Sequence, residues 1–421
     1  MGGLSLEASG RPAVEKRVDA GSSVALDASG QERLVRLLAA ATFLIFFQAY
    51  MVAPLIPRLS AAFGVSAQTI GLIVPAYLIP YGVATLVYGV LSDRLGRRRI
   101  MLVSLTAFVL LTGLTAAARS VSELVAIRLV TGLGASGVVP LGLALIGQVY
   151  PYERRGRPLG WLFGAMAGGA AFGSTFGALL EPWLGWRWIF ILVSALGAVM
   201  FALLLPYRGL LGEAPPTPTA TMMDVTRGYR ALLTTGRGQR TYAYVLLNAI
   251  FHSGVFTWLG LYFSQRHGLG EVGIGLALLG YGVPGFVLGP IIGRAADRWG
   301  RRWLIPAGLG IAALAAVFLM LDVPVIVAAL AVTLLSLGYD MTQPLLAGIV
   351  TALGGKRAGQ AMGLNVFCLF TGFGLGSLLF GEALTLGFGN ALAVFSVVQL
   401  AAAFTAIPLF RSETTPSASR P

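Results

Sequence analysis

Four polar side chains lie along one face of an otherwise apolar segment near residues 325–350. Thr333, Ser336, Asp340 and Gln343 follow one another at intervals of three, four and three residues, which is the spacing of one helical face. An acid among apolar residues is costly to bury, so it marks a candidate functional position. Asp340 could exchange a proton or contact a polar ligand; the alternative is a structural acid paired with a donor elsewhere in the fold.

A second candidate face pairs an amide with an imidazole. Asn248 and His252 are four residues apart in an apolar segment and therefore share one side of a helix. A neutral histidine often serves as a hydrogen-bonding core residue. The alternatives for His252 are a ligand contact and a proton relay with Asp340.

A stripe of aromatic hydroxyls begins with Tyr77 and Tyr81 in a further apolar segment. Such a weakly polar wall suits sugars, amphiphiles and planar molecules alike. Gln48 and Asn365 are isolated amides in two other apolar segments and could complete the same cavity.

Arg128 is a cation near one end of an apolar segment, five residues after Glu123. Three roles are open to it. It could hold an anionic ligand, govern the protonation of a carboxylate, or extend its guanidinium to the membrane interface.

The elements that position these residues follow from the composition. Hydrophobic residues make up 56% of the 421 residues and charged residues only 11%, and the mean hydropathy is +0.80. The apolar residues form runs of about twenty, enough for a helix to cross a hydrocarbon layer about 30 Å thick. These runs are too long and continuous for barrel strands, so we expect an all-α membrane protein.

Twelve apolar runs are present, six on each side of a polar segment. The expected organisation is a disordered tail without a signal peptide, a first six-helix bundle, a linker, a second six-helix bundle and a short tail. These parts cover residues 1–31, 32–206, 207–240, 241–410 and 411–421.

The basic residues set the orientation. The net charge of +13 does not indicate nucleic-acid binding, because the arginines lie in short loops between apolar runs. If both termini are cytoplasmic, all but five of the 30 Lys and Arg residues fall in cytoplasmic segments or tails. The exceptions are Arg58, Arg119, Arg187 and Arg266 on the outer side and Arg128 within a helix. The positive-inside rule therefore places both termini in the cytoplasm.

One motif occurs twice, once in each half of the chain. Residues 89–98 and 293–302 both read GxxxDRxGRR. The shared positions are Gly89, Asp93, Arg94, Gly96, Arg97 and Arg98 in the first copy, and Gly293, Asp297, Arg298, Gly300, Arg301 and Arg302 in the second. Two related halves joined by a basic linker are typical of secondary transporters.

These motifs resemble those of the major facilitator superfamily, over essentially everything after the N-terminal tail. Arg128, Gly132 and Gly134 are similar to the family's RxxxGxG motif in the fourth helix. Gly160, Gly169, Gly173 and Gly177 resemble the fifth-helix glycine pattern of its proton-linked drug and metabolite exporters, with Ser174 and Ala178 as departures. The resemblance implies the major facilitator fold, with twelve transmembrane helices in two pseudo-symmetric bundles.

The resemblance also implies roles. The two GxxxDRxGRR loops would form a conformational latch, in which carboxylates bind arginines in one state and release them in another, with Glu153 as an acidic partner. Setting topology alone is the simpler alternative. The second half has no acid at the position corresponding to Glu153. The fifth-helix glycines would let helices approach closely.

The expected function is proton-coupled export of a small organic solute by alternating access. Many drug–proton antiporters have an acid in the first helix, but this sequence has none there. Asp340 is therefore the expected proton carrier. The alternative function is uptake or facilitated transport of a sugar or organic acid. Two remoter alternatives are a non-transporting sensor and an intramembrane serine protease built on Ser136 and His252.

The expected setting follows from the same features. The partners are the lipid bilayer, a small organic solute and protons, without cofactor, metal or nucleic acid. The expected protein is a monomer in a bacterial inner (plasma) membrane.

Overall fold

The computed structural model describes residues 28–150, 156–209, 222–355 and 358–413. Within these ranges the regular structure is helical throughout, without a strand. The expectation of an all-α protein is therefore confirmed.

The first half of the chain forms α1 to α8. Their bounds are α1 Ala28–Tyr50, α2 Ile56–Phe63, α3 Ala67–Gly71, α4 Pro75–Leu95, α5 Arg97–Thr115, α6 Val121–Ala135, α7 Val138–Val149 and α8 Gly156–Leu204, with short 3-10 turns η1 (Ala53–Leu55) and η3 (Leu205–Gly209).

The second half forms α9 to α17. Their bounds are α9 Met222–Leu233, α10 Gly236–Thr257, α11 Leu259–His267, α12 Glu271–Ala277, α13 Val283–Trp299, α14 Arg301–Phe318, α15 Val325–Gly354, α16 Ala358–Ala383 and α17 Phe388–Leu409, with a 3-10 turn η5 at Leu384–Leu386.

Ten helical segments in the described ranges are long and apolar enough to cross a membrane. One of them, residues 160–207, is 48 residues long and turns back at Gly185, whose φ of 73° only glycine adopts readily, so it supplies two crossings. The remaining predicted crossing is α12 followed by α13, which is interrupted between Leu278 and Gly282.

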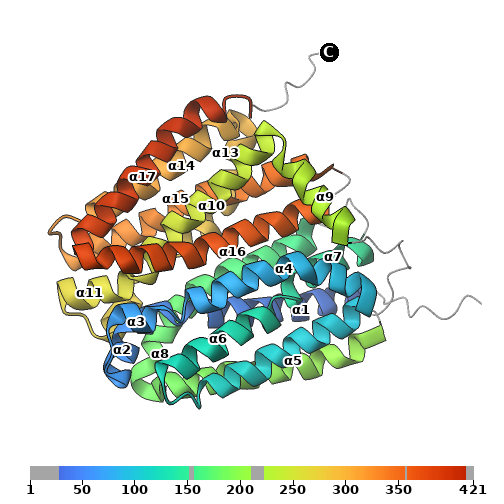
Figure 1. Cartoon of the computed structure of the whole chain (residues 1–421), viewed down its shortest axis with the longest axis horizontal. Helices are drawn as coiled ribbons and strands as arrows, with labels where there is room; N and C mark the ends of the chain where they lie inside the picture. The colour runs from blue at the N-terminus through green and yellow to red at the C-terminus, as the bar shows by residue number, and fades with distance from the viewer. Residues whose placement is uncertain (1–27, 151–155, 210–221, 356–357, 414–421) are drawn as a thin grey trace, which may run out of the picture.

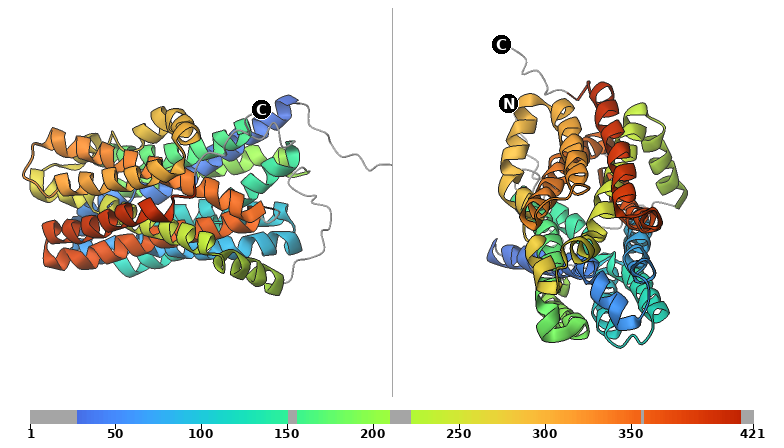
Figure 2. Two further views of the ribbon diagram at one scale, coloured as in Figure 1. Left: turned by 90° about the horizontal axis from the view of Figure 1, so that it is seen from above. Right: turned by 90° about the vertical axis from the view of Figure 1, so that its left-hand side faces the viewer.

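The two halves of the chain lie side by side (Figures 1 and 2). Helices such as α16 run near the long axis of the molecule, whereas α14 and α17 run obliquely to it (Figure 1). Within the halves α1 packs along α8, α10 along α16, and α14 along α15 and α17. Between the halves, α4 packs along α16 and α8 against α12 and α13, while α11 contacts α2 and η1. We call the end of the molecule that carries α2, α3 and α11 the α3 end, and the opposite end, with α7 and α9, the α9 end.

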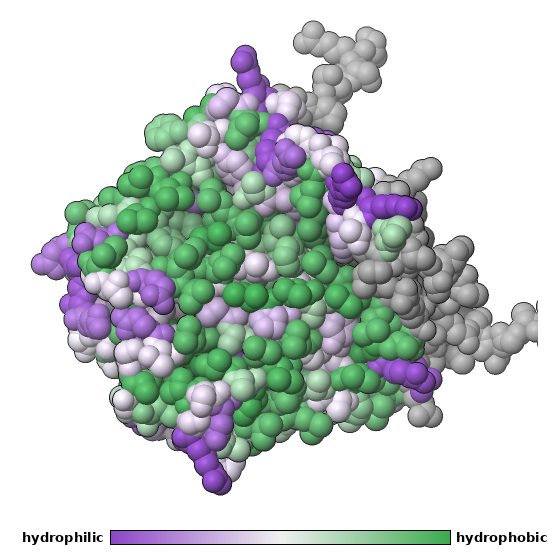
Figure 3. Space-filling model, in the orientation of Figure 1, coloured by the Kyte–Doolittle hydropathy of each residue, from purple (hydrophilic) through white to green (hydrophobic). Residues whose placement is uncertain are grey.

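The outer surface has the polarity of a protein embedded in lipid. Large apolar side chains are exposed along α5, α8, α14 and α17, among them Leu110, Trp188, Leu314 and Phe404. Figure 3 shows this apolar surface across the middle of one face, with hydrophilic residues gathered towards its ends. The chain is therefore built to bury its sides in hydrocarbon.

Some details differ from the sequence-based boundaries. α1 begins at Ala28, inside the predicted tail, and the predicted linker contains α9 and the first turn of α10. The expected disorder of residues 1–27 concerns a segment outside the described ranges. The first described residue of α1 and the end of α17 lie at the α9 end of the molecule (Figure 1).

Candidate functional site

Asp340 lies midway along α15 and is held by a short chain of hydrogen bonds. The Ser336 hydroxyl donates to Asp340 Oδ2 at 3.1 Å, and the same Ser336 oxygen accepts from the backbone N–H of Gly282 at 2.9 Å. The backbone N–H of Gly285 also donates to the Asp340 carboxylate. Ser336 and Asp340, which were predicted to share one helical face, are bonded to each other, and through Gly282 they join α15 to the start of α13.

The break between α12 and α13 creates this site. Gly282 has φ of +80°, a conformation that strains other residues, and Pro284 occupies the first turn of α13, where a missing N–H costs little. The first N–H groups of a helix have no partner within it and carry partial positive charge. Asp340 therefore lies at the N-terminus of a half-helix inside the membrane, an arrangement typical of ion and substrate sites in transporters.

His252 is enclosed by aromatic rings. Its Nε2 is hydrogen-bonded to the Tyr281 hydroxyl, and its ring stacks on Tyr339 at a centroid distance of 4.0 Å. Phe256 stacks on Tyr281 at 4.1 Å. Tyr281 lies in the α12–α13 break and Tyr339 precedes Asp340, so His252 and Asp340 border the same region without a direct bond between them in the structure.

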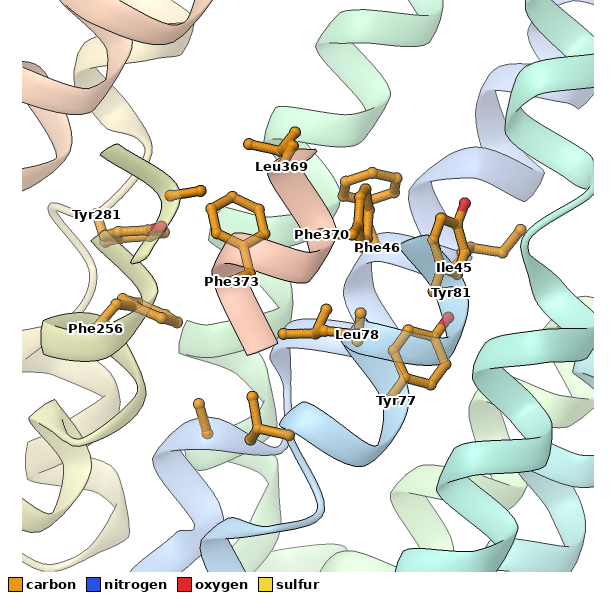
Figure 4. Close-up of a cluster of buried hydrophobic side chains, with 14 of the residues drawn as sticks. Ile45, Phe46, Tyr77, Leu78, Tyr81, Phe256, Tyr281, Leu369, Phe370 and Phe373 are labelled. Carbon is orange, nitrogen blue, oxygen red and sulfur yellow. The ribbon is translucent and has the colours of Figure 1, made fainter. Parts of the chain in front are cut away.

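A row of aromatic rings continues from this region into the other half. Phe373 and Phe370 of α16 lie between Tyr281 and Phe256 on one side and Tyr81 on the other (Figure 4). Tyr81 stacks on Phe370 at 4.3 Å, and Tyr77 follows Tyr81 at 5.8 Å. The predicted tyrosine stripe is therefore one end of a wall that spans both halves.

Arg128 is completely buried within the first half, which rules out the role in which it extends to the interface. Its Nε donates to the carbonyl of Ile73 at 3.2 Å, and Nη1 makes a long contact of 3.5 Å with the carbonyl of Gln48. The guanidinium carbon lies 4.3 Å from the ring centre of Tyr77. Ile73 belongs to the break between α3 and α4. Each half of the chain therefore has a charged side chain at an interrupted helix: Arg128 at the α3–α4 break and Asp340 at the α12–α13 break.

Many buried polar atoms around this wall lack a protein partner. They are Arg128 Nη2, both amide atoms of Gln48 and of Gln343, the Tyr77 and Tyr81 hydroxyls, His252 Nδ1 and Asn365 Oδ1. Buried polar groups without partners are uncommon and need water or a ligand. Other described residues, among them Ser104 and Tyr262, also have buried polar atoms without a partner. The atoms named here belong to the candidate residues and can bond water or a polar ligand.

Three residues considered from the sequence have partners elsewhere. Asn248 accepts from Gln399 of α17 at 3.1 Å, which turns its oxygen towards a helix outside the aromatic wall. Thr333 bonds the carbonyl of Ala329 in its own helix. Glu123 accepts from the backbone N–H of Arg119 at 2.8 Å and does not pair with Arg128.

The repeated motif has the same backbone turn in both halves. Gly96 separates α4 from α5 with φ of 88°, and Gly300 separates α13 from α14 with φ of 80°. A side chain at either position would be strained, which explains why both copies of the motif have glycine there. Glu153 lies outside the described residues, and so do the side chains of Asp93, Arg94 and Asp297. The latch therefore stays a prediction.

A different acid supports the motif of the second half. Glu413, just beyond α17, accepts from Arg237 at 2.7 and 2.8 Å and also from Arg240. Its carbonyl accepts from the Arg302 N–H at 3.3 Å. Partial burial opposes ionisation of Glu413, but the hydrogen bonds and charges of the two arginines outweigh it and lower its pKa. This contact joins the ends of α10, α14 and α17.

The glycines of α8 pack directly on α1 and on Met51 immediately after it, with one exception. A methyl group at Gly169, Gly173 or Gly177 would come within 2.5, 2.5 and 2.7 Å of the carbonyl oxygens of Phe43, Phe47 and Met51 respectively. At Gly160 a methyl group would meet nothing within 4 Å, so the prediction of close packing does not hold there. Three of the four glycines thus allow backbone contact between the helices.

The Ser136–His252 pair considered from the sequence is not formed in this structure. The Ser136 hydroxyl donates to the carbonyl of Leu133 at 2.9 Å, while His252 is bonded to Tyr281 in the other half. Among the described residues, no group of three or more His, Cys, Asp or Glu side chains could hold a metal ion.

Broken helices, buried charges and a helical surface suited to lipid together define a polytopic membrane protein of the transporter class. The model of the Major Facilitator Superfamily matches residues 38–376 and, in an overlapping second match, residues 245–421. The chain belongs to this superfamily.

Curated relatives and solved structures agree with this assignment. A chloramphenicol resistance protein of Pseudomonas aeruginosa is 26% identical over 264 residues, which cover 62% of this chain and 61% of that protein. The alignments with the first such relatives span about three fifths of each relative's length.

Two solved structures share the fold. The bacterial homologue of the human lysosomal transporter Spinster, in its inward-facing and occupied conformation, matches with a TM-score of 0.73 and 17% identity over 93% of this chain and 100% of that one. A D-xylose–proton symporter matches with a TM-score of 0.70 and 18% identity over 93% and 99% of the two chains.

Proposed function

We propose that this protein is a secondary transporter that exchanges a small organic solute for protons across the membrane by alternating access. The observation that carries the proposal is Asp340, a carboxylate in the middle of α15 that faces the N-terminus of the half-helix α13. The partial positive charge there favours the ionised acid, whereas the apolar surroundings favour the protonated one. A carboxylate held between opposing effects of this kind suits reversible proton binding.

The aromatic wall and the unpartnered polar atoms support the solute pathway. His252 and Tyr281 border both Asp340 and the wall, so a solute that displaces their contacts would be coupled to the protonation of Asp340. Gln343 and Asn365 offer buried amides that a solute or water can use.

The contacts between the halves support a conformation closed at the α3 end. Trp258 of the second half packs over Gly71, and Gly260 packs on Pro54. Gly275 of α12 lies against Leu179 and the carbonyl of Thr175 in α8. We propose that the α9 end is cytoplasmic, as the arginine distribution predicts, and that the two halves open alternately at either end. A bacterial inner membrane and a monomer are the proposed setting.

Export is the proposed direction. Relatives named for chloramphenicol and multidrug resistance support it, as does the direct packing of α8 on α1 at three glycines. Uptake of a metabolite is the second candidate function, because a sugar–proton symporter shares this fold.

Proton movement in liposomes tests this proposal. The purified protein is reconstituted with a trapped pH-sensitive dye under an inward-acidic gradient, and chloramphenicol and other candidate solutes are added. We expect solute-dependent proton efflux from wild type and none from Asp340→Asn. Asp322→Asn is the matched control, because Asp322 has a side chain 99% exposed in the α14–α15 connection.

Two results would count against it. Labelled-solute flux without proton movement, unchanged in Asp340→Asn, would replace exchange by facilitated transport. Equal loss of proton efflux in Asp340→Asn and Asp322→Asn would remove Asp340 as the carrier.

A further inference from the structure

Arg128 has a positive charge that the described protein does not balance. The guanidinium is completely buried, and among the described residues no carboxylate pairs with it. Its contacts are two neutral carbonyls and the face of Tyr77, and Nη2 has no partner. A buried, unpaired charge is among the most costly features a protein can contain, and more so in a membrane.

The neighbours of Arg128 can complete a binding site. Gln48 brings its backbone oxygen to Arg128 and has an unpartnered side-chain amide, while Tyr77, which lies against the guanidinium, has an unpartnered hydroxyl. Tyr81 adds another unpartnered hydroxyl beside Tyr77. Guanidinium, amide and hydroxyl groups together donate the hydrogen bonds that a carboxylate or similar anion accepts.

We propose that these four residues form an anion subsite, so that the transported solute carries a carboxylate or an equivalent anionic group beside an aromatic or other planar body. The inference rests on the proposed transport function and specifies its substrate class. The planar body would lie along the aromatic wall that begins at Tyr77 and Tyr81 and continues through Phe370 (Figure 4).

The subsite is closed in this structure and opens where the halves meet. Tyr81 of α4 stacks on Phe370 of α16 at 4.3 Å, and Tyr77 covers the guanidinium. Separation of α4 from α16 uncovers the tyrosines and gives an anion access to Arg128. Binding of the anion would then replace the contact between the halves.

Equilibrium binding of a matched pair of probes tests the proposal. 2-Naphthoate and 2-naphthamide have the same planar body and differ in charge. Affinities come from the rise in unfolding temperature of the purified full-length protein with probe concentration. A hydrogen bond to a charged group predicts that wild type binds the carboxylate roughly 10- to 100-fold more tightly than the amide.

Two substitutions make the test specific. Arg128→Gln is expected to remove the preference. Gln48→Glu introduces a carboxylate at the residue whose backbone carbonyl contacts Arg128, and its side-chain end has no other partner to hold it away. We expect this carboxylate to balance the guanidinium, so the variant should also lose the preference while remaining folded. It keeps the test informative if Arg128→Gln does not fold.

The outcomes separate this proposal from the transport mechanism. Equal affinity of wild type for the two probes, including no measurable binding of either, overturns the anion subsite, and so does a preference that survives in Gln48→Glu. Binding does not require proton exchange, so a preference for the carboxylate retained in Asp340→Asn supports the subsite even if proton coupling fails.

Discussion

The contact between α8 and α1 gives a quantitative prediction at Gly173. A methyl group there would lie 2.5 Å from the Phe47 carbonyl oxygen and 2.8 Å from its Cα, whereas ordinary contact begins at 3.4 Å. The helices would have to separate by about 0.9 Å, since the carbonyl belongs to a helix backbone that cannot rotate away. Overpacking of this kind typically costs about 1–3 kcal/mol, so Gly173→Ala should lower the free energy of unfolding by that amount.

Gly160→Ala is the matched control, because the same helix offers its methyl group open space. Alanine is a better helix former than glycine by up to about 1 kcal/mol in water, so this variant should be neutral or slightly more stable. Both are measured by denaturant unfolding in mixed micelles, followed by tryptophan fluorescence.

A second comparison tests the mechanism of the loss. Gly169 and Gly173 contact the same helix, so one displacement of α1 relieves both clashes. The double alanine variant should therefore cost less than the sum of the single variants. Equal stability of Gly173→Ala and Gly160→Ala would refute the close-packing argument.

Three further predictions follow from other contacts. Glu413→Gln should destabilise the protein near neutral pH, because the ion contact with Arg237 is lost. Since the pKa of Glu413 is lowered by folding, its contribution is present above the unfolded value near 4.5 and declines as pH falls below it, so thermal unfolding curves of the variant and wild type should converge in acid; a constant difference at all pH values would contradict this. Gly285→Ala would place a methyl group 2.7 Å from Asp340 Oδ1 and should reduce proton-coupled flux with little change in expression; unchanged flux would argue against the helix-terminus site. Gly96→Ala should destabilise by about 1 kcal/mol or more because its φ is positive, with no steric contribution since nothing lies within 4 Å; thermal unfolding equal to that of wild type would contradict it.

The sequence predicts those parts of the fold that depend on length and repetition. Long apolar runs require helices in lipid, and the double GxxxDRxGRR motif identifies two related halves. The sequence predicts less about where a membrane helix is interrupted. The break at Gly282 follows from glycine and proline in an apolar run, but these residues also occur inside continuous membrane helices.

The site was predictable where helical periodicity applies. Ser336 and Asp340 are four residues apart on one helix, and the structure bonds them to each other. Tyr281 comes from the break between α12 and α13 and Phe373 from α16, so their proximity to His252 depends on tertiary packing that spacing along the chain does not encode. Gln399 was missed for the same reason, although an amide in an apolar run is a usable signal.

The acid of the second half illustrates a different limit. The loop corresponding to Glu153 has no carboxylate, so the sequence indicated only that the contact must differ. Glu413 lies in a segment expected to be a simple tail, and nothing in its neighbourhood predicts burial. Its role follows from the position of α17 beside α10 and α14, which brings three chain ends together.

Accumulation of labelled solute against its gradient tests the central claim most directly. Liposomes containing the protein receive a pH gradient of either sign, at equal solute concentration inside and outside. Proton exchange predicts that an acidic interior drives accumulation above the external concentration, that an alkaline interior drives depletion, and that a proton ionophore abolishes both. Equilibration to the external concentration under either gradient would contradict coupled exchange.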